Sequence, residues 1–268
     1  YNLVGSFSGA LGALAVGLPS LLSADPLAGY RVLICGYVAF AIVMLVLFAF
    51  LSPAIEAETR SAVSLRTMGV QRSRGIVAKL ASLFALDAFA GGFMVQSLVA
   101  YWFYLRYKTD INSLGHIFFG ANLLSALSFL AAPFLAHRIG LLNTMVFTHL
   151  PSNFLLLLIP LMPSLEFTVA VLLARHLLSQ LDVPTRQSYT MAVIDSNERA
   201  ASAGIMSVAR NAGAAIAPVF TGAVLAAPSL GLPFLLAGGL KIIYDVWIFA
   251  LFRHVRPPEE RREKRSAF

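Results

Sequence analysis

Residues 52–75, SPAIEAETRSAVSLRTMGVQRSRG, form the one long polar stretch of a chain that is otherwise apolar. Of its 268 residues, 58% are hydrophobic and 12% are charged. Soluble domains contain about 45–50% apolar and about 25% charged residues, and a transmembrane helix needs about 20 mainly apolar residues. The apolar stretches are continuous and do not alternate with polar residues, which excludes an outer-membrane barrel. The composition therefore predicts an all-α, polytopic bundle of transmembrane helices.

Breaks at proline, glycine and charged residues divide the apolar sequence into eight expected spans. They cover residues 2–22, 30–51, 80–105, 114–136, 142–162, 166–190, 200–227 and 232–252. The chain is thus expected to contain a two-helix group (1–51), a polar linker (52–79), a six-helix group (80–252) and a basic tail (253–268).

The distribution of basic residues predicts which side of the membrane the linker faces. The linker and the tail hold most of the 20 Lys and Arg residues, whereas the opposite side would hold Arg106, Lys108 and at most Arg31. Such an excess is typical of cytoplasmic loops. We therefore expect a multi-pass protein of the plasma (inner) membrane with both ends of this segment cytoplasmic. The tail would face anionic membrane lipid and not nucleic acid, and the aromatic cluster Tyr101–Tyr104 would form an interfacial belt.

Small residues recur every four positions in two of the expected spans. They are Gly5, Gly9, Ala13 and Gly17 in the first and Ala209, Gly213 and Ala217 in the seventh. This spacing lets helix backbones approach closely in lipid, so either span alone favours plain helix packing. The two together indicate two related halves, each with a small-residue helix before its final span.

The basic linker, the six-helix group and this repeat resemble the major facilitator superfamily (MFS). The loop between the fourth and fifth spans is similar to the superfamily's motif Gly-x-Leu-Ala-Asp-Arg-x-Gly-Arg, with Leu135, Ala136, Arg138 and Gly140 matching and His137 in place of the acid. The resemblance implies twelve helices in two bundles. This chain would hold the last two helices of the first bundle and all six of the second, with the missing N-terminal helices of the same chain as their partners.

The resemblance also implies a function, namely secondary active transport of a small solute by alternating access. Proton coupling is expected, and export is an option because the glycine-rich first span is similar to a motif of the antiporter branches. A non-transporting membrane scaffold and a half-transporter that keep the MFS fold remain as alternatives. The sequence contains no phosphate-binding loop, no His-Glu-x-x-His, no Gly-x-Ser-x-Gly and no cluster of metal ligands. We therefore expect no enzyme activity, no cofactor and no metal.

Asp87 is the predicted proton-coupling residue. A charged side chain inside a span costs at least about 2.5–3.5 kcal/mol on insertion scales, so each one is a functional candidate. A lone buried carboxylate can bind and release a proton, and the nearby Gly91 and Gly92 permit the helix to bend. The alternatives are that an arginine neutralises Asp87 or that Asp87 lies at the membrane interface.

Polar residues of five spans are predicted to line the substrate cavity, and they are Gln96, Asn122, Asn153, Arg175 and Arg210. The planar guanidinium of Arg210 suits a carboxylate or phosphate, although it could equally neutralise Asp87 or Asp182. For the two asparagines, a polar contact between helices is the commoner explanation.

Two pairs of charged residues follow from helical spacing. Asp182 and Arg186 lie near the cytoplasmic end of their span and are predicted as a cytoplasmic gate, with His137 and Arg138 of the neighbouring loop in reach. A static ion pair at the helix end is the alternative. Lys241 and Asp245 are separated by one turn and are expected to pair with each other.

Overall fold

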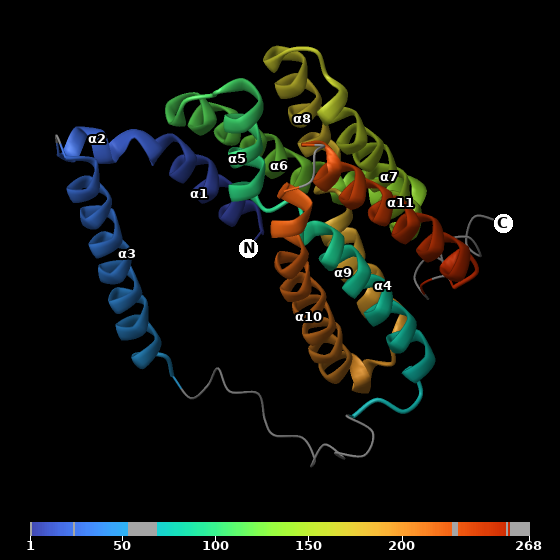
Figure 1. The fold of residues 1–268 in the computed structure, drawn as a ribbon. Coiled ribbons are helices and arrows are strands. Elements are labelled where there is room, and N and C mark those ends of the chain that lie inside the picture. Colours follow the sequence, from blue (N-terminus) through green and yellow to red (C-terminus); the bar gives the residue numbers. More distant parts are fainter. Residues whose placement is uncertain (1, 24, 53–68, 227–229, 256, 258–268) are drawn as a thin grey trace.

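The computed structural model of the protein describes residues 2–23, 25–52, 69–226, 230–255 and 257. Within these ranges every regular element is a helix, which confirms the predicted all-α class (Figure 1). The α-helices are α1 (Asn2–Leu14), α2 (Leu18–Leu22), α3 (Pro26–Ala49), α4 (Arg74–Gly92), α5 (Gln96–Tyr107), α6 (Ile111–Ile139), α7 (Leu141–Leu158), α8 (Leu165–Ser179), α9 (Asp182–Val193), α10 (Arg199–Ala226) and α11 (Leu232–Phe252). The 3₁₀ turns within these ranges are η1 (Ala15–Gly17), η3 (Ile159–Leu161) and η4 (Ser196–Glu198). Linker residues 53–68 and tail residues 258–268 lie outside the described residues.

Six helical segments are long and apolar enough to cross a membrane. They are Leu27–Ala49, Arg74–Tyr107, Ile111–Ile139, Leu141–Leu161, Ser196–Thr221 and Leu232–Phe252. The protein is thus a helical membrane protein with six such segments in its described part, and the expected count of eight is not confirmed.

The two remaining expected spans are shorter or interrupted helices. In the first, the apolar helical stretch covers only Asn2–Gly17, and Pro19 lies at the start of the separate helix α2. The other, expected over 166–190, is broken between α8 and α9. Pro184 explains this break, because it has no N–H to donate to the carbonyl of Gln180, four residues earlier.

A third break divides the segment Arg74–Tyr107, where the sequence predicted a weak point in the helix. α4 ends at Gly92, and Val95 has an extended backbone before α5 begins at Gln96. Gly92 is also a packing position, because a methyl group added there would collide with the side chain of Ala217 on α10. The break therefore lies at a close contact between α4 and α10.

Helices α4–α11 form one bundle, and α3 lies apart from it (Figure 1). α1 packs along α6, while α3 contacts α2. None of the apolar window within Leu27–Ala49 is buried inside the protein. The apolar surface of α3 thus has the composition of a lipid-facing helix and no protein cover among the described residues.

Most members of the small-residue repeats lie at helix contacts, as the sequence predicted, whereas Gly5 has no neighbour within 4 Å of an added methyl group. Gly213 of α10 faces the backbone of Ala85 on α4, with no space for a side chain. Gly115 of α6 likewise faces the carbonyl of Ala13 on α1. Both pairs bring backbones close together, which is how helices associate in lipid without large apolar side chains between them.

Candidate functional site

Asp87 is the centre of a buried ionic network formed by four helices. Its side chain, on α4, is 6% exposed. Lys241 of α11 donates from Nζ to Asp87 Oδ1, and Arg186 Nη1 of α9 lies 3.0 Å from Oδ2. Arg210 Nη1 of α10 is 3.6 Å from the same Oδ2, too far for a hydrogen bond. Asp87 is therefore not a lone carboxylate, and the structure agrees with the alternative in which cations neutralise it. Its role in proton coupling stays a prediction.

Arg186 joins two acidic residues. Besides Asp87, its Nη1 contacts Asp182 Oδ2 at 3.2 Å within α9. The guanidinium also lies over the ring of Phe84, 5.5 Å from the ring centre. The predicted Asp182–Arg186 ion pair is thus present, and it belongs to the same network as Asp87.

The other two residues of the predicted gate lie elsewhere. His137 and Arg138 are exposed at the end of α6. Arg138 stacks on the ring of Phe134, with 4.4 Å between the guanidinium carbon and the ring centre. Neither residue has an ion pair with Asp182 or Arg186 in the described part of the chain, and the structure therefore does not bring the four gate residues together.

The expected pair between Lys241 and Asp245 is wrong. Lys241 bonds to Asp87, whereas Asp245, which is fully buried, accepts from Asn153 Nδ2 at 2.8 Å and lies 2.8 Å from His149 Nδ1. One turn of α11 therefore presents its charged groups to different neighbours, α4 and α7. His149 and Asn153 lie one turn apart on α7, and both reach this carboxylate.

The other predicted cavity residues are distributed over different surroundings. Gln96 is exposed at the start of α5. Asn122 donates from Nδ2 to the carbonyl of Phe118 and lies against Gly9 of α1, a contact between helices. Arg175 lies one turn before the end of α8, and its buried Nε has no hydrogen-bond partner among the residues that are described. Of these predicted cavity residues, Arg210 belongs to the ionic network, and Arg175 lies near the end of α8, which leads into α9.

Exposure varies strongly across the network. The side chains of Arg186 and Lys241 are each 10% exposed, whereas that of Arg210 is 37% exposed. Solvent screens a charge pair less the more it is buried. The pairs at Asp87 are therefore strong where Lys241 and Arg186 meet it, and the network reaches the surface at Arg210.

A second polar contact holds the beginning of α4, and the sequence did not predict it. Glu198 of η4 accepts hydrogen bonds from the backbone N–H groups of Gln71, Arg72 and Ser73 at 2.7, 2.7 and 2.8 Å. The backbone N–H of Asp195 in turn donates to Ser73 Oγ. A carboxylate is well placed there, because the first N–H groups of a helix have no partner within the helix. We call this contact the Glu198 cap.

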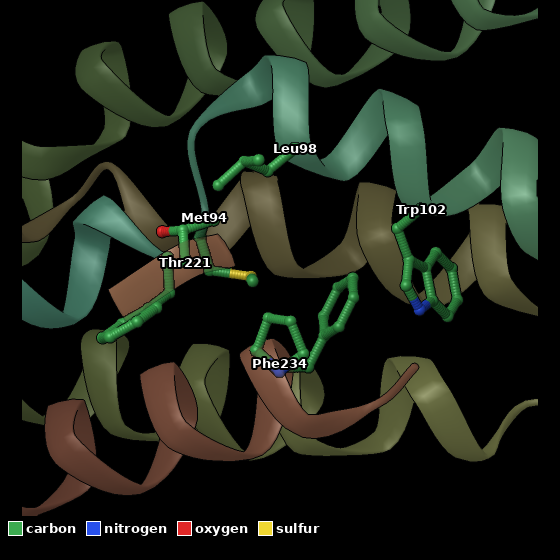
Figure 2. A pocket seen from close by; sticks show the side chains of 7 residues that line it. Met94, Leu98, Trp102, Thr221 and Phe234 are labelled. Carbon is green, nitrogen blue, oxygen red and sulfur yellow. The ribbon is translucent and has the colours of Figure 1, made fainter. Parts of the chain in front are cut away.

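A small apolar pocket lies beside the break between α4 and α5 (Figure 2). Its empty space of about 230 Å³ includes the part that is open to the outside, and its lining consists of Phe93, Met94, Leu98, Trp102, Thr221, Pro233 and Phe234. The expectation of an interfacial belt is wrong for Trp102 and Phe103, which are buried, while Tyr101 and Tyr104 are exposed. The pocket carries no charged group and is separate from the ionic network.

The described residues contain no group of His, Cys, Asp and Glu side chains that could hold a metal ion.

No protein-family model matches the sequence, and no solved structure matches it. A protein of Saccharomyces cerevisiae named Uncharacterized membrane protein YJR124C is 23% identical over 287 residues. The match covers 94% of this chain and 64% of that protein, so the chain spans less than two thirds of its relative. The similarity agrees with the membrane-length helices and assigns no activity to this chain.

Proposed function

We propose that the chain is part of a secondary active transporter of the MFS type, which moves a small solute across a membrane by alternating access. The observation that carries this proposal is the ionic network around Asp87, which joins α4, α9, α10 and α11. Buried charges are costly in a membrane and concentrate along the paths of ions and substrates. A network that ties four helices together and is exposed at one residue fits such a path.

Ion pairs suit a carrier, because they hold one arrangement of the helices and can be exchanged for another. Arg186 contacts both Asp87 and Asp182, so α9 can move while the guanidinium keeps one of its two partners. Lys241 bonds to Asp87 and lies one turn from Asp245. Both cations thus have a second carboxylate on their own helix.

Proton coupling at Asp87 remains part of the proposal, with a condition that the geometry adds. Cations close to a carboxylate favour its charged form. Lys241 and Arg186 must therefore move away before Asp87 can bind a proton. Opening of the ion pairs and proton uptake would be linked steps of one cycle.

The test uses the full-length protein in liposomes, after a thermal-shift screen has identified a stabilising solute. Counterflow of that labelled solute, above the level in protein-free liposomes, is the expected result. Asp87→Asn is expected to abolish uptake driven by a pH gradient and to retain exchange. Unchanged pH-driven uptake in Asp87→Asn would remove the coupling role, and a protein without counterflow of any stabilising solute would be a membrane scaffold.

A further inference from the structure

The charged residues inside the helical spans do not balance. More than three residues from either end of the eight expected spans, the sequence places three carboxylates, Asp87, Asp182 and Asp245, and four permanent cations, Arg175, Arg186, Arg210 and Lys241. Asp245 is occupied by His149 and Asn153. Two carboxylates therefore remain for four cations.

The contacts of the four cations show which of them are satisfied. Lys241 and Arg186 both hydrogen-bond to Asp87, and Arg186 also contacts Asp182. Arg210 forms only the long 3.6 Å pair with Asp87, and its buried Nη1 makes no hydrogen bond. Arg175 has neither a hydrogen bond nor an ion pair within the described ranges, and its Nε is buried.

Both underused arginines lie around the same centre. Arg210 Nη1 lies 3.6 Å from Asp87, and Arg175 lies near the end of α8, which leads directly into α9, the helix of Asp182 and Arg186. In this arrangement the two carboxylates bind Arg186 and Lys241, whereas the buried Arg175 Nε and Arg210 Nη1 have no hydrogen-bond acceptor among the described residues. A guanidinium has five donors in a planar fork, and the acceptors that match the fork are the paired oxygens of a carboxylate or phosphate.

We propose that the solute carries an anionic group, a carboxylate or a phosphate, and that Arg175 is its principal binding residue with Arg210 as a second cation. This inference rests on the proposed function, since it names the class of substrate for the same network. The bound anion completes the charge balance. It also supplies the acceptors that Arg175 lacks, while the loose contact of Arg210 with Asp87 leaves that guanidinium free to turn toward the solute.

The test measures thermal unfolding of the full-length protein in phosphatidylcholine nanodiscs at constant ionic strength. The probes are inorganic phosphate and succinate, and the reference solutes are glucose and choline chloride. The expected result is a saturable rise in Tm with phosphate or succinate at millimolar concentration and none with the reference solutes. A ligand that binds only the folded state raises Tm in this way. If neither anion shifts Tm, or if glucose or choline does so equally, the proposal is overturned.

Matched variants assign the effect to Arg175. Arg175→Gln is expected to abolish the anion-dependent shift, and Arg175→Lys to weaken it, because an ammonium keeps the charge and loses the fork. Arg31→Gln, which removes the same charge from an exposed position on α3, should keep the full shift. Rescue by lysine to the wild-type shift would refute the need for the guanidinium fork, and an undiminished shift in Arg175→Gln would show that Arg175 does not bind the anion.

Two further comparisons separate the possible outcomes. Adding phosphatidylglycerol to the nanodiscs should leave the shift unchanged, and its loss would mean that a lipid headgroup, not a solute, occupies the site. An anion shift that depends on Arg175 without any counterflow would refute the transporter and retain the anion site. Counterflow of a neutral or cationic solute that is unaffected by Arg175→Gln would refute the anion site and retain the transporter.

Discussion

Asp87→Asn is expected to be the most damaging single substitution in the ionic network. The change keeps the size of the side chain and removes its charge. Lys241 then loses the one carboxylate with which it forms an ion pair in the described part of the chain, and its remaining acceptor on the backbone is the carbonyl of residue 87 at 3.5 Å. Arg186 still has Asp182 at 3.2 Å, so the greater part of the loss falls on Lys241.

The size of the effect follows from burial. Lys241 and Asp87 are 10% and 6% exposed, and removal of one partner from a buried pair costs about 3–5 kcal/mol of unfolding free energy. Lys241→Met removes the cation and keeps an apolar chain of similar length. Because the double variant Asp87→Asn/Lys241→Met leaves no unpaired lysine, its cost should be about 1–3 kcal/mol less than the sum of the two single costs.

The assay is reversible unfolding in dodecylmaltoside micelles with added SDS, followed by circular dichroism. Asp25→Asn is the matched control, because Asp25 caps α3 at an exposed position and asparagine caps equally well. This control should lie within about 0.5 kcal/mol of the wild type. A loss of less than about 1 kcal/mol in Asp87→Asn, or strictly additive single effects, would refute the assignment of this ion pair as a main stabilising contact.

Three further predictions concern other parts of the protein. Gly213→Ala should lower the unfolding free energy by about 1–3 kcal/mol, because the added methyl group meets the backbone of α4. Gly204→Ala on the same helix is the matched control: its methyl group has open space, so the change should be neutral or stabilising by up to about 1 kcal/mol. Glu198→Gln should speed amide hydrogen exchange at the start of α4, and unchanged exchange there would contradict the Glu198 cap. Hydrogen bonds from the Ser113 hydroxyl and from the amides of the first turn of α6 lower the pKa of Asp110 from its usual 3.8. The stabilisation of the folded protein by these bonds is therefore complete above pH 3.8 and is lost as the pH falls through the lowered pKa. A carboxyl NMR titration checks this, and an ordinary midpoint would disprove it.

The sequence predicted those features that depend on spacing along one helix. The Asp182–Arg186 ion pair, the shared face of His149 and Asn153, and the small residues at helix contacts all follow from helical periodicity. The break between α4 and α5 follows from two adjacent glycines. Each of these signals lies within a few residues of its consequence.

Features that depend on distant contacts were not predictable in this way. Lys241 has an acid one turn away, yet it bonds to Asp87, 154 positions earlier in the chain, because α11 packs against α4. The Glu198 cap joins residues 125 to 127 positions apart. Helical spacing shows which residues share a face, but not which neighbouring helix that face meets.

The contact between α1 and α6 has a mechanical consequence. Glycines occupy both sides of it, with Gly9 and Gly17 against α6 and Gly115 against the first segment. The side chains of Asn122 and Asn112 occupy the space that Gly9 and Gly17 leave open, and Val16 fills the space beside Gly115, so the two surfaces interlock. Sliding of α1 along α6 would drive these side chains against the next turn, and α1 is therefore expected to move together with α6 as one rigid unit.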